Sequence, residues 1–234
     1  MNTTPVTFDP ATIDTPTGMA PALALSDISG VPVQGSGLAG QVFVPGTKIW
    51  DIDAARAAAT NAPELEFVAS EIAYGGKKSD TTVAEFLGDD AATLTGDGTA
   101  YEMGPSAVTL TGYVFIPEGV HEIKVVSDDG FALSLGGEAF SSYEGTRPAE
   151  GTARVAEFEG GLYAFDLLYF DASGSMSLSV EVDGLPVDES AFYQMPEDLQ
   201  SPPGDVATVL VGDYHPSYFL GASVLDTPVT QAAT

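Results

Sequence analysis

VSDDGFALSLGG, residues 126–137, is the stretch that decides the fold of this chain. It places two adjacent acidic residues, Asp128 and Asp129, and a glycine between two runs with the composition of β-strands. Neighbouring side chains of a strand point to opposite faces, so two adjacent carboxylates do not normally converge. If they do converge, the backbone between them is unusual and a hard cation holds the negative charges together. The stretch therefore predicts a calcium site beside a β-strand.

The same residues also have a simpler interpretation. Asp-Gly is a common dipeptide in the tight turns of β-hairpins, and most Asp-Asp-Gly sequences between strands are only turns. Taken alone, residues 128–130 favour such a turn. The residues on either side of 128–130 are needed to distinguish the calcium site from the simple turn.

The charge balance of the chain is strongly acidic. There are 34 Asp and Glu against 7 Lys and Arg, which gives a formal net charge of −27. Such a surface repels nucleic acids and anionic membranes, so we expect neither as a partner. It suits a salt-rich or calcium-rich extracellular setting, where ions screen carboxylates. Selection for solubility alone would produce the same composition.

Length and cysteine content limit the class of protein. The 234 residues can form one large β-domain, and no segment approaches the roughly 20 apolar residues of a membrane helix. The absence of cysteine excludes disulfides and thiolate chemistry. No secretion signal opens the sequence, which leaves either a cytosolic protein or a piece of a longer exported chain. We favour the second, and expect a monomeric module without membrane insertion.

The second half of the sequence is typical of an all-β domain. Short β-branched or aromatic runs alternate with Gly, Pro or Asp turns, and no helix intervenes. This spacing predicts an antiparallel β-sandwich with one or two short helices and long ligand-binding loops. Strands are predicted at 107–116, 120–126, 131–135, 153–158, 162–170 and 176–182, with a long loop at 139–151.

The first half adds a few elements around this core. Trp50 and Tyr74 are expected to fill the core, and Asp89, Asp90 and Asp97 to lie in solvated turns. Further elements are predicted as strands at 38–44 and 65–74, a short helix at 51–59 capped by Asp51 or Asp53, and a helical turn at 81–87.

Three regions are expected along the chain. Residues 1–34 are predicted to be an extension that adds at most a strand, and residues 35–190 the main domain. Residues 191–234 are predicted to be a C-terminal extension partly packed on the sandwich, with one more strand at 206–211.

Several segments together resemble the protective-antigen-type β-sandwich, a fourteen-kilodalton module common in adhesins. They are GLAGQVF at residues 37–43, FLGDD at 86–90, GYVFIP at 112–117, SDDGF at 127–131, GGLY at 160–163 and Tyr169-Phe170. The ordered set is more specific than any one of its members. It favours the calcium site over the simple turn.

The resemblance implies a set of calcium ligands. In the lectin branch of this family, which includes yeast flocculins and large bacterial adhesins, paired aspartates joined by a cis peptide bond hold calcium, and the ion binds vicinal sugar hydroxyls. Carried over to this sequence, the metal ligands are Asp128, Asp129, Asp171 and the carbonyl groups of Ser173 and Ser175. The sugar-binding residues implied are Asp128, Asp129, Tyr143, Arg147, Ser173 and Gly174. The loop at residues 171–175 lacks the aromatic wall of the flocculins.

The implied function is a calcium-dependent lectin domain of a large secreted or bacterial cell-surface adhesin. It would bind a hexose or fucose of a cell-surface glycan or polysaccharide in cell adhesion or biofilm formation. An enzyme is disfavoured, because glycosidase carboxylates lie about 5–9.5 Å apart across a bond and are not consecutive residues. No nucleophile elbow, HExxH or phosphate loop occurs either. A structural or protein-contact module of an exported protein is the open alternative.

Overall fold

Two antiparallel β-sheets form the body of the computed structural model, which describes residues 31–76 and 80–195. The strands are β1 (Val33–Gln34), β2 (Leu38–Phe43), β3 (Leu65–Ala69), β4 (Ala73–Gly76), β5 (Ser106–Ile116), β6 (Gly119–Asp128), β7 (Phe131–Leu135), β8 (Glu138–Tyr143), β9 (Glu150–Phe158), β10 (Gly161–Asp171), β11 (Met176–Val182), β12 (Leu185–Pro186) and β13 (Phe192–Gln194). The helices are α1 (Ile52–Ala58), α2 (Val83–Leu87) and the 3₁₀ turns η3 (Gly88–Thr93) and η4 (Glu189–Ala191).

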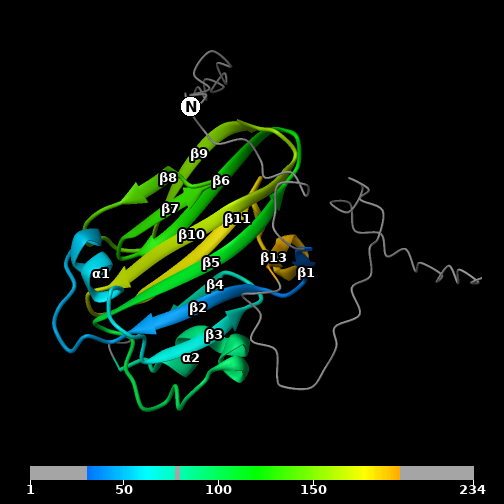
Figure 1. Cartoon of the computed structure of the whole chain (residues 1–234). Coiled ribbons are helices and arrows are strands. Elements are labelled where there is room, and N and C mark those ends of the chain that lie inside the picture. The colour runs from blue at the N-terminus through cyan, green and yellow to red at the C-terminus, as the bar shows by residue number, and fades with distance from the viewer. Residues whose placement is uncertain (1–30, 77–79, 196–234) are drawn as a thin grey trace, which may run out of the picture. The chain divides into compact units, whose positions relative to one another are not determined.

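The two sheets form a sandwich. The larger sheet has eight strands in the order β1-β13-β5-β10-β7-β8; β2 pairs with β5, and β3 pairs with β2. The smaller sheet has five strands in the order β12-β11-β6-β9, with β4 beside β11. Figure 1 shows α1 at the end of the sandwich toward which β10 runs. The predicted all-β antiparallel sandwich with short helices is confirmed.

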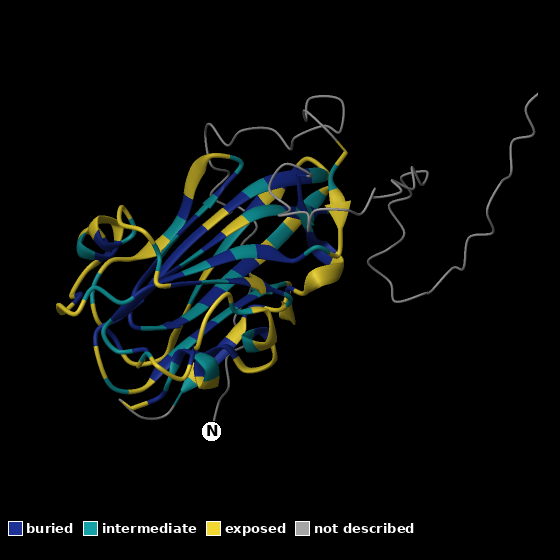
Figure 2. Cartoon of the chain, turned by 60° about the horizontal axis from the view of Figure 1, so that its bottom comes forward, coloured by how far each residue is buried: buried dark blue, intermediate teal, exposed yellow. Residues whose placement is uncertain are grey.

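Alternating burial along the strands builds the core between the sheets. Phe131, Leu133 and Leu135 of β7 are buried, and the residues between them are partly exposed. This is the period of two that a sheet with one covered face imposes. Figure 2 shows the buried segments running along the strands and the exposed residues gathered in the connections.

The end of β10 departs from this alternation because both of its faces are covered. Tyr169 belongs to the main core, whereas Leu168 and Phe170 pack with α1 in a second, smaller cluster. Asp171 follows Tyr169 at the strand period, and therefore continues the inner face of β10. The fold thus places a carboxylate at the rim of the interior.

Both predicted helical segments are confirmed. Asp51 is the N-cap of α1, and its side chain accepts a hydrogen bond of 2.8 Å from the backbone N–H of Ala54. Thr82 and Glu85 form a capping box at the start of α2. None of the helices in the described ranges has the length and apolarity needed to cross a lipid bilayer.

Two predicted elements are wrong. Residues 65–74 form β3 and β4, which belong to different sheets, because the chain changes sheets between them. Residues 139–151 are not a long loop, since β8 reaches Tyr143 and β9 begins at Glu150. As an edge strand, β8 is largely exposed and lacks apolar alternation. The strand predicted at 206–211 lies outside the described residues.

Two single-residue expectations are also wrong. Trp50 is 55% exposed, although Tyr74 is buried as expected. Asp90 is buried rather than solvated. Its carboxylate accepts hydrogen bonds from the Ser70 hydroxyl and from the Tyr74 hydroxyl, the latter at 2.6 Å. Asp90 therefore ties η3 to the strands β3 and β4.

We expect Asp90→Ala to lower the free energy of unfolding by about 1–3 kcal/mol, because it leaves the buried Tyr74 hydroxyl without its acceptor. Asp89→Ala removes the same charge from an exposed neighbour and should change stability by less than about 0.5 kcal/mol. Urea denaturation of both variants measures the difference. Equal midpoints for the two variants would contradict a structural role of Asp90.

Candidate metal centre

The Asp128–Asp129 pair lies where the chain crosses from one sheet to the other. β6 pairs with β9 and β11 in the smaller sheet, whereas β7 pairs with β10 and β8 in the larger sheet. Residues 129–130 are therefore a connection between sheets and not the turn of a β-hairpin. The hairpin interpretation of the Asp-Asp-Gly sequence is wrong.

A second crossing meets the first at the same end of the sandwich. Residues 172–175 lead from β10 of the larger sheet to β11 of the smaller one. The backbone N–H of Asp129 donates to the carbonyl of Phe170 at 3.3 Å, and the N–H of Phe170 donates to the carbonyl of Gly130 at 3.0 Å. These bonds hold the two crossings side by side.

Three predicted ligands converge between these crossings. One carboxylate oxygen from each of Asp128, Asp129 and Asp171 lies within 4.8 Å of the others. The peptide bond between Asp128 and Asp129 is cis. Residues 42 positions apart in the sequence thus contribute to one acidic cluster, which we call the Asp triad.

Hydrogen bonds fix the carboxylate of Asp129. Its Oδ1 accepts from the backbone N–H of Arg147 at 3.0 Å, and its Oδ2 accepts from the N–H of Ala172 at 2.7 Å. The Ser127 hydroxyl donates to the carbonyl of Asp129 at 2.7 Å. Each carboxylate oxygen keeps a further lone pair that can bind a cation.

Asp171 is the member of the triad that most needs a cation. Its side chain is 0% exposed, and within the described part of the chain neither carboxylate oxygen has a hydrogen-bond partner. Burial, followed by the charges of Asp129 and Asp128, raises the pKa of Asp171 to about 8. Burial and the Asp129 charge also raise the pKa of Asp128. Buried carboxylates without partners are costly unless a positive charge compensates them.

The chemistry of the donors fits a hard divalent ion. All three side chains offer carboxylate oxygens, which suit calcium or magnesium, and the chain has no cysteine that could supply a thiolate. Calcium takes about six to eight oxygens, so carbonyl groups, water or a ligand must complete the shell. The Asp triad can therefore bind a metal ion and leave coordination positions open.

Arg147 holds the residue that precedes the Asp128–Asp129 pair. Its side chain is 8% exposed, and its guanidinium donates to the carbonyl and hydroxyl oxygens of Ser127 and, at 2.8 Å, to the hydroxyl of Thr152. The guanidinium carbon also lies 4.3 Å from the ring centroid of Tyr143. A sugar contact of Arg147 stays a prediction, whereas its role in holding Ser127 is evident.

The remaining predicted site residues border the triad in different ways. Tyr143 is 36% exposed at the end of β8. Ser173, Gly174 and Ser175 lie in the second crossing, and nothing lies within 4 Å of the position that a Cβ atom of Gly174 would occupy. The calcium ligation by the carbonyl groups of Ser173 and Ser175 stays a prediction.

Sequence reasoning missed Gly104. A Cβ atom on this residue would lie 2.7 Å from Oδ2 of Asp171, so a larger residue here requires the Asp171 carboxylate to shift. Gly104 is followed by a cis proline, so the Gly104-Pro105 dipeptide was the available signal for a special backbone. The backbone of Gly104 therefore packs directly against the carboxylate of Asp171.

Sequence reasoning also placed Trp50 incorrectly. This exposed aromatic residue lies just before α1, and the backbone N–H of Ile52 donates to the carbonyl of Glu144 at 2.9 Å. The segment that carries Trp50 is thereby joined to the chain that follows Tyr143. Ile49 and Ile52, on either side of Trp50 in the sequence, are buried. Two apolar residues so close to Trp50 could have indicated that they fill the core and that Trp50 faces outward.

Comparisons with known proteins agree with this fold. Residues 77–191 match the family model described as the PA14 domain. No curated protein sequence matches the chain. Among solved structures, the PA14 domain of the MpAFP antifreeze protein is similar, with 22% identity over 75% of this chain and 99% of that one and a TM-score of 0.63.

Two further structures are sugar-binding or adhesin domains. The PA14 sugar-binding domain from an RTX adhesin has 22% identity over 70% of this chain and 94% of its own, with a TM-score of 0.53. The Epithelial Adhesin 6 A domain from Candida glabrata, in complex with Galb1-3GlcNAc, has 14% identity over 82% of this chain and 100% of its own, with a TM-score of 0.54. At these identities the similarity establishes the fold.

We expect protons to compete with calcium at the triad. The pKa of Asp171 is about 8, against 3.8 for an ordinary Asp, so protonation stabilises the metal-free fold. That contribution is complete below about pH 4 and is lost as the pH rises through about 8. In chelator, the melting temperature should therefore fall between about pH 5 and pH 8.5, while the calcium affinity rises about 10-fold or more. Calorimetry at several pH values measures both, and a calcium affinity independent of pH would contradict the assignment.

We also expect Gly104→Ala to weaken calcium binding about 10-fold, because the new methyl group displaces the Asp171 carboxylate. Gly145→Ala is the control, since no atom lies within 4 Å of its added Cβ. Isothermal titration with calcium compares the two variants. Unchanged affinity in Gly104→Ala would show that Asp171 does not contribute to the ion site.

Proposed function

We propose that the domain matched by the PA14 family model at residues 77–191 is a calcium-dependent lectin that binds vicinal hydroxyls of a hexose or fucose. The observation that carries the proposal is the buried carboxylate of Asp171, which has no hydrogen-bond partner in the described residues and lies beside Asp128 and Asp129. A cation is the partner that satisfies all three groups at once.

The protein groups prepare the site in two ways. Asp129 is held by two backbone N–H groups, so its orientation is fixed before any ligand arrives. Asp128 is only partly buried, and therefore lies on the side of the triad that solvent reaches. A calcium ion bound here would offer its open coordination positions on that side, where two adjacent hydroxyls can replace two waters.

The connection at 172–175 would form one border of the sugar site. It consists of small residues, and Gly174 leaves its surroundings open. The backbone carbonyl groups of Ser173 and Ser175 are the proposed remaining calcium ligands. Tyr143 is the proposed aromatic contact, because it is partly exposed at the end of β8. The proposed site thus comprises both sheet crossings and the end of one edge strand.

A single site of this kind binds weakly. A chelated diol gives roughly millimolar affinity, or about −4 to −5 kcal/mol. Useful adhesion then requires many copies on one surface. We therefore propose an extracellular adhesin, in which residues 35–190 are one binding module of a longer exported chain and mediate adhesion or biofilm formation without catalysis.

A structural role is the second candidate, because an ion at the triad would join the two sheet crossings whether or not it binds a sugar. A glycan array of the full chain, run with calcium and then with chelator, separates the candidates. Signals that disappear in chelator support the lectin. A calcium-dependent rise in melting temperature without any glycan signal favours the structural module.

We expect Asp171→Asn to abolish calcium binding and glycan binding while it stabilises the metal-free fold near pH 8. The substitution keeps the shape of the side chain and removes a buried charge that two neighbouring carboxylates repel. Thermal melts with calcium and with chelator, together with glucose, mannose or fucose titrations, measure these effects. Asp166→Asn is the matched control, since Asp166 is exposed on the same strand. Glycan binding retained by Asp171→Asn would move the site elsewhere.

A further inference from the structure

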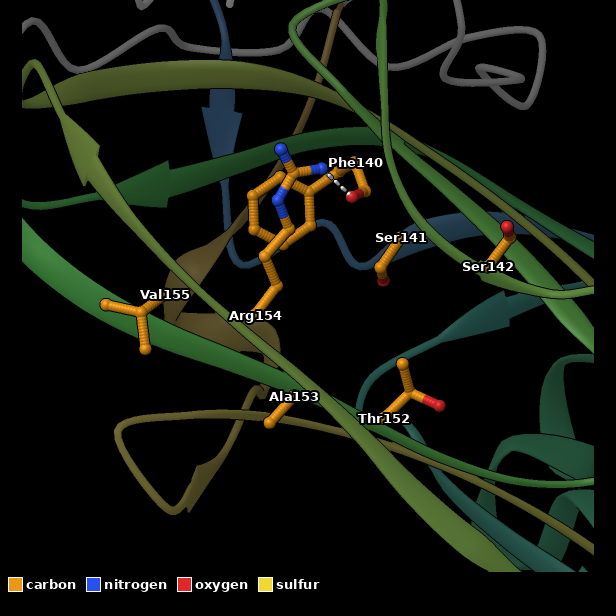
Figure 3. A pocket seen from close by; sticks show the side chains of 7 residues that line it. All are labelled: Phe140, Ser141, Ser142, Thr152, Ala153, Arg154 and Val155. Carbon is orange, nitrogen blue, oxygen red and sulfur yellow. Dashed lines mark hydrogen bonds between the residues drawn. The ribbon is translucent and has the colours of Figure 1, made fainter. Parts of the chain in front are cut away.

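Two sheet edges face each other at the side of the sandwich. β8 is the last strand of the larger sheet and β9 is the last strand of the smaller one, and the two are not paired in the described structure. Between them lies an open groove of about 440 Å³. Figure 3 shows its lining residues: Phe140, Ser141, Ser142, Thr152, Ala153, Arg154 and Val155.

Arg154 is the charged group of this groove. Its guanidinium lies over the ring of Phe140, 5.0 Å from the centroid, and donates one hydrogen bond to the Phe140 carbonyl (Figure 3). No carboxylate of the described residues lies within ion-pair distance of it. Most of its five N–H donors remain available for a ligand.

Three residues with hydroxyl groups line the same groove as Arg154. The Oγ atom of Ser141 is buried and has no hydrogen-bond partner among the described residues. Ser142 and Thr152 line the same groove. A buried hydroxyl without a partner is costly, and a ligand that carries its own hydroxyl groups would satisfy it. The lining therefore combines one cation for a carboxylate with several groups for hydroxyls.

The groove is poorly suited to an added peptide strand. The register of β7 and β8 shifts between Leu133 and Ser134, opposite the bulged residue Phe140. The carbonyl of Phe140 is already occupied by Arg154, so the edge of β8 cannot offer it to a new strand. A charged side chain at a sheet edge also opposes edge-to-edge pairing.

We propose that this groove is a second saccharide site, which binds an acidic sugar unit through its carboxylate and its hydroxyls. The carboxylate pairs with the guanidinium of Arg154, whose planar donors match two carboxylate oxygens. The sugar hydroxyls bind Ser141 and Ser142. This site goes beyond the calcium-dependent lectin function and needs no metal ion.

Arg147 separates the groove from the Asp triad. Its guanidinium packs on Tyr143 at the end of β8 and donates to Thr152 of β9, so it bridges the two edge strands at that end. A ligand in the groove therefore contacts Arg154 without contacting the triad. The two sites can be tested independently.

The test uses the full chain in chelator, which removes any contribution of the triad. Glucuronate is titrated into labelled protein and followed by amide chemical shifts, with glucose and sulfate as probes that lack either the carboxylate or the sugar ring. We expect glucuronate to bind at least about 10-fold more tightly than either. Arg154→Gln should weaken glucuronate binding about 10-fold or more, whereas Arg56→Gln, which removes an exposed charge from α1, should not change it.

The outcomes that overturn the proposal are distinct. Equal binding of sulfate and glucuronate would leave only a general anion site, and tighter binding of a tri-glutamate peptide would make the groove a peptide site. Equal affinities of Arg154→Gln and Arg56→Gln for glucuronate would exclude a role of the Arg154 guanidinium in binding.

If Arg154→Gln lacks a cooperative melt, Ser141→Ala and Ser142→Phe replace it, because they alter the lining of the groove and keep the charge of Arg154. Glucuronate binding retained in both would then refute the site. Loss of calcium-dependent glycan binding affects none of these results.

Discussion

The structure depends on the electrostatics of three carboxylates at the end of the sandwich. Asp128, Asp129 and Asp171 bring oxygens within 4.8 Å of one another, and two of the three residues, Asp129 and Asp171, are buried. The fold compensates Asp129 with two backbone N–H groups, but it offers no hydrogen-bond donor among the described residues to Asp171. Repulsion between like charges grows as the surroundings become less polar. Such a cluster is consistent with a native state that binds a cation.

The sandwich makes this cluster possible because two sheet crossings meet at one end. One crossing contains Asp129, the other follows Asp171, and backbone bonds between residues 129–130 and Phe170 join them. Each crossing is anchored in a different pair of strands, so the separation of the carboxylates is set by the packing of the sheets. α1 covers the outer face of β10 and holds Phe170 in place. The metal centre is therefore a property of the whole sandwich and not of a single loop.

The sequence predicted many of the strands and helices, and the predictions that were wrong or missing have common physical causes. The strands at 131–135 and 176–182 and the helix at 51–59 follow from apolar alternation and capping, which are local signals. β8 was missed because an edge strand with exposed polar residues lacks alternation. The burial of Asp90 and the contact of Gly104 with Asp171 arise from residues distant in the sequence, which no local pattern encodes. The Asp triad was predicted only through a family resemblance, since adjacency alone favoured a turn.

The two arginines beside β8 and β9 show how an acidic protein uses its few cations. The guanidinium of Arg147 donates internal hydrogen bonds that hold Ser127 next to the triad, and its charge lies close to the carboxylates. Arg154 has one carbonyl as its acceptor and lies along the same strand pair, farther from the triad. At physiological salt the charge of the distant surface is screened over roughly 8 Å, so a ligand in contact with Arg154 experiences mainly the local field. A net charge of −27 is thus compatible with a local site for an anion in the groove.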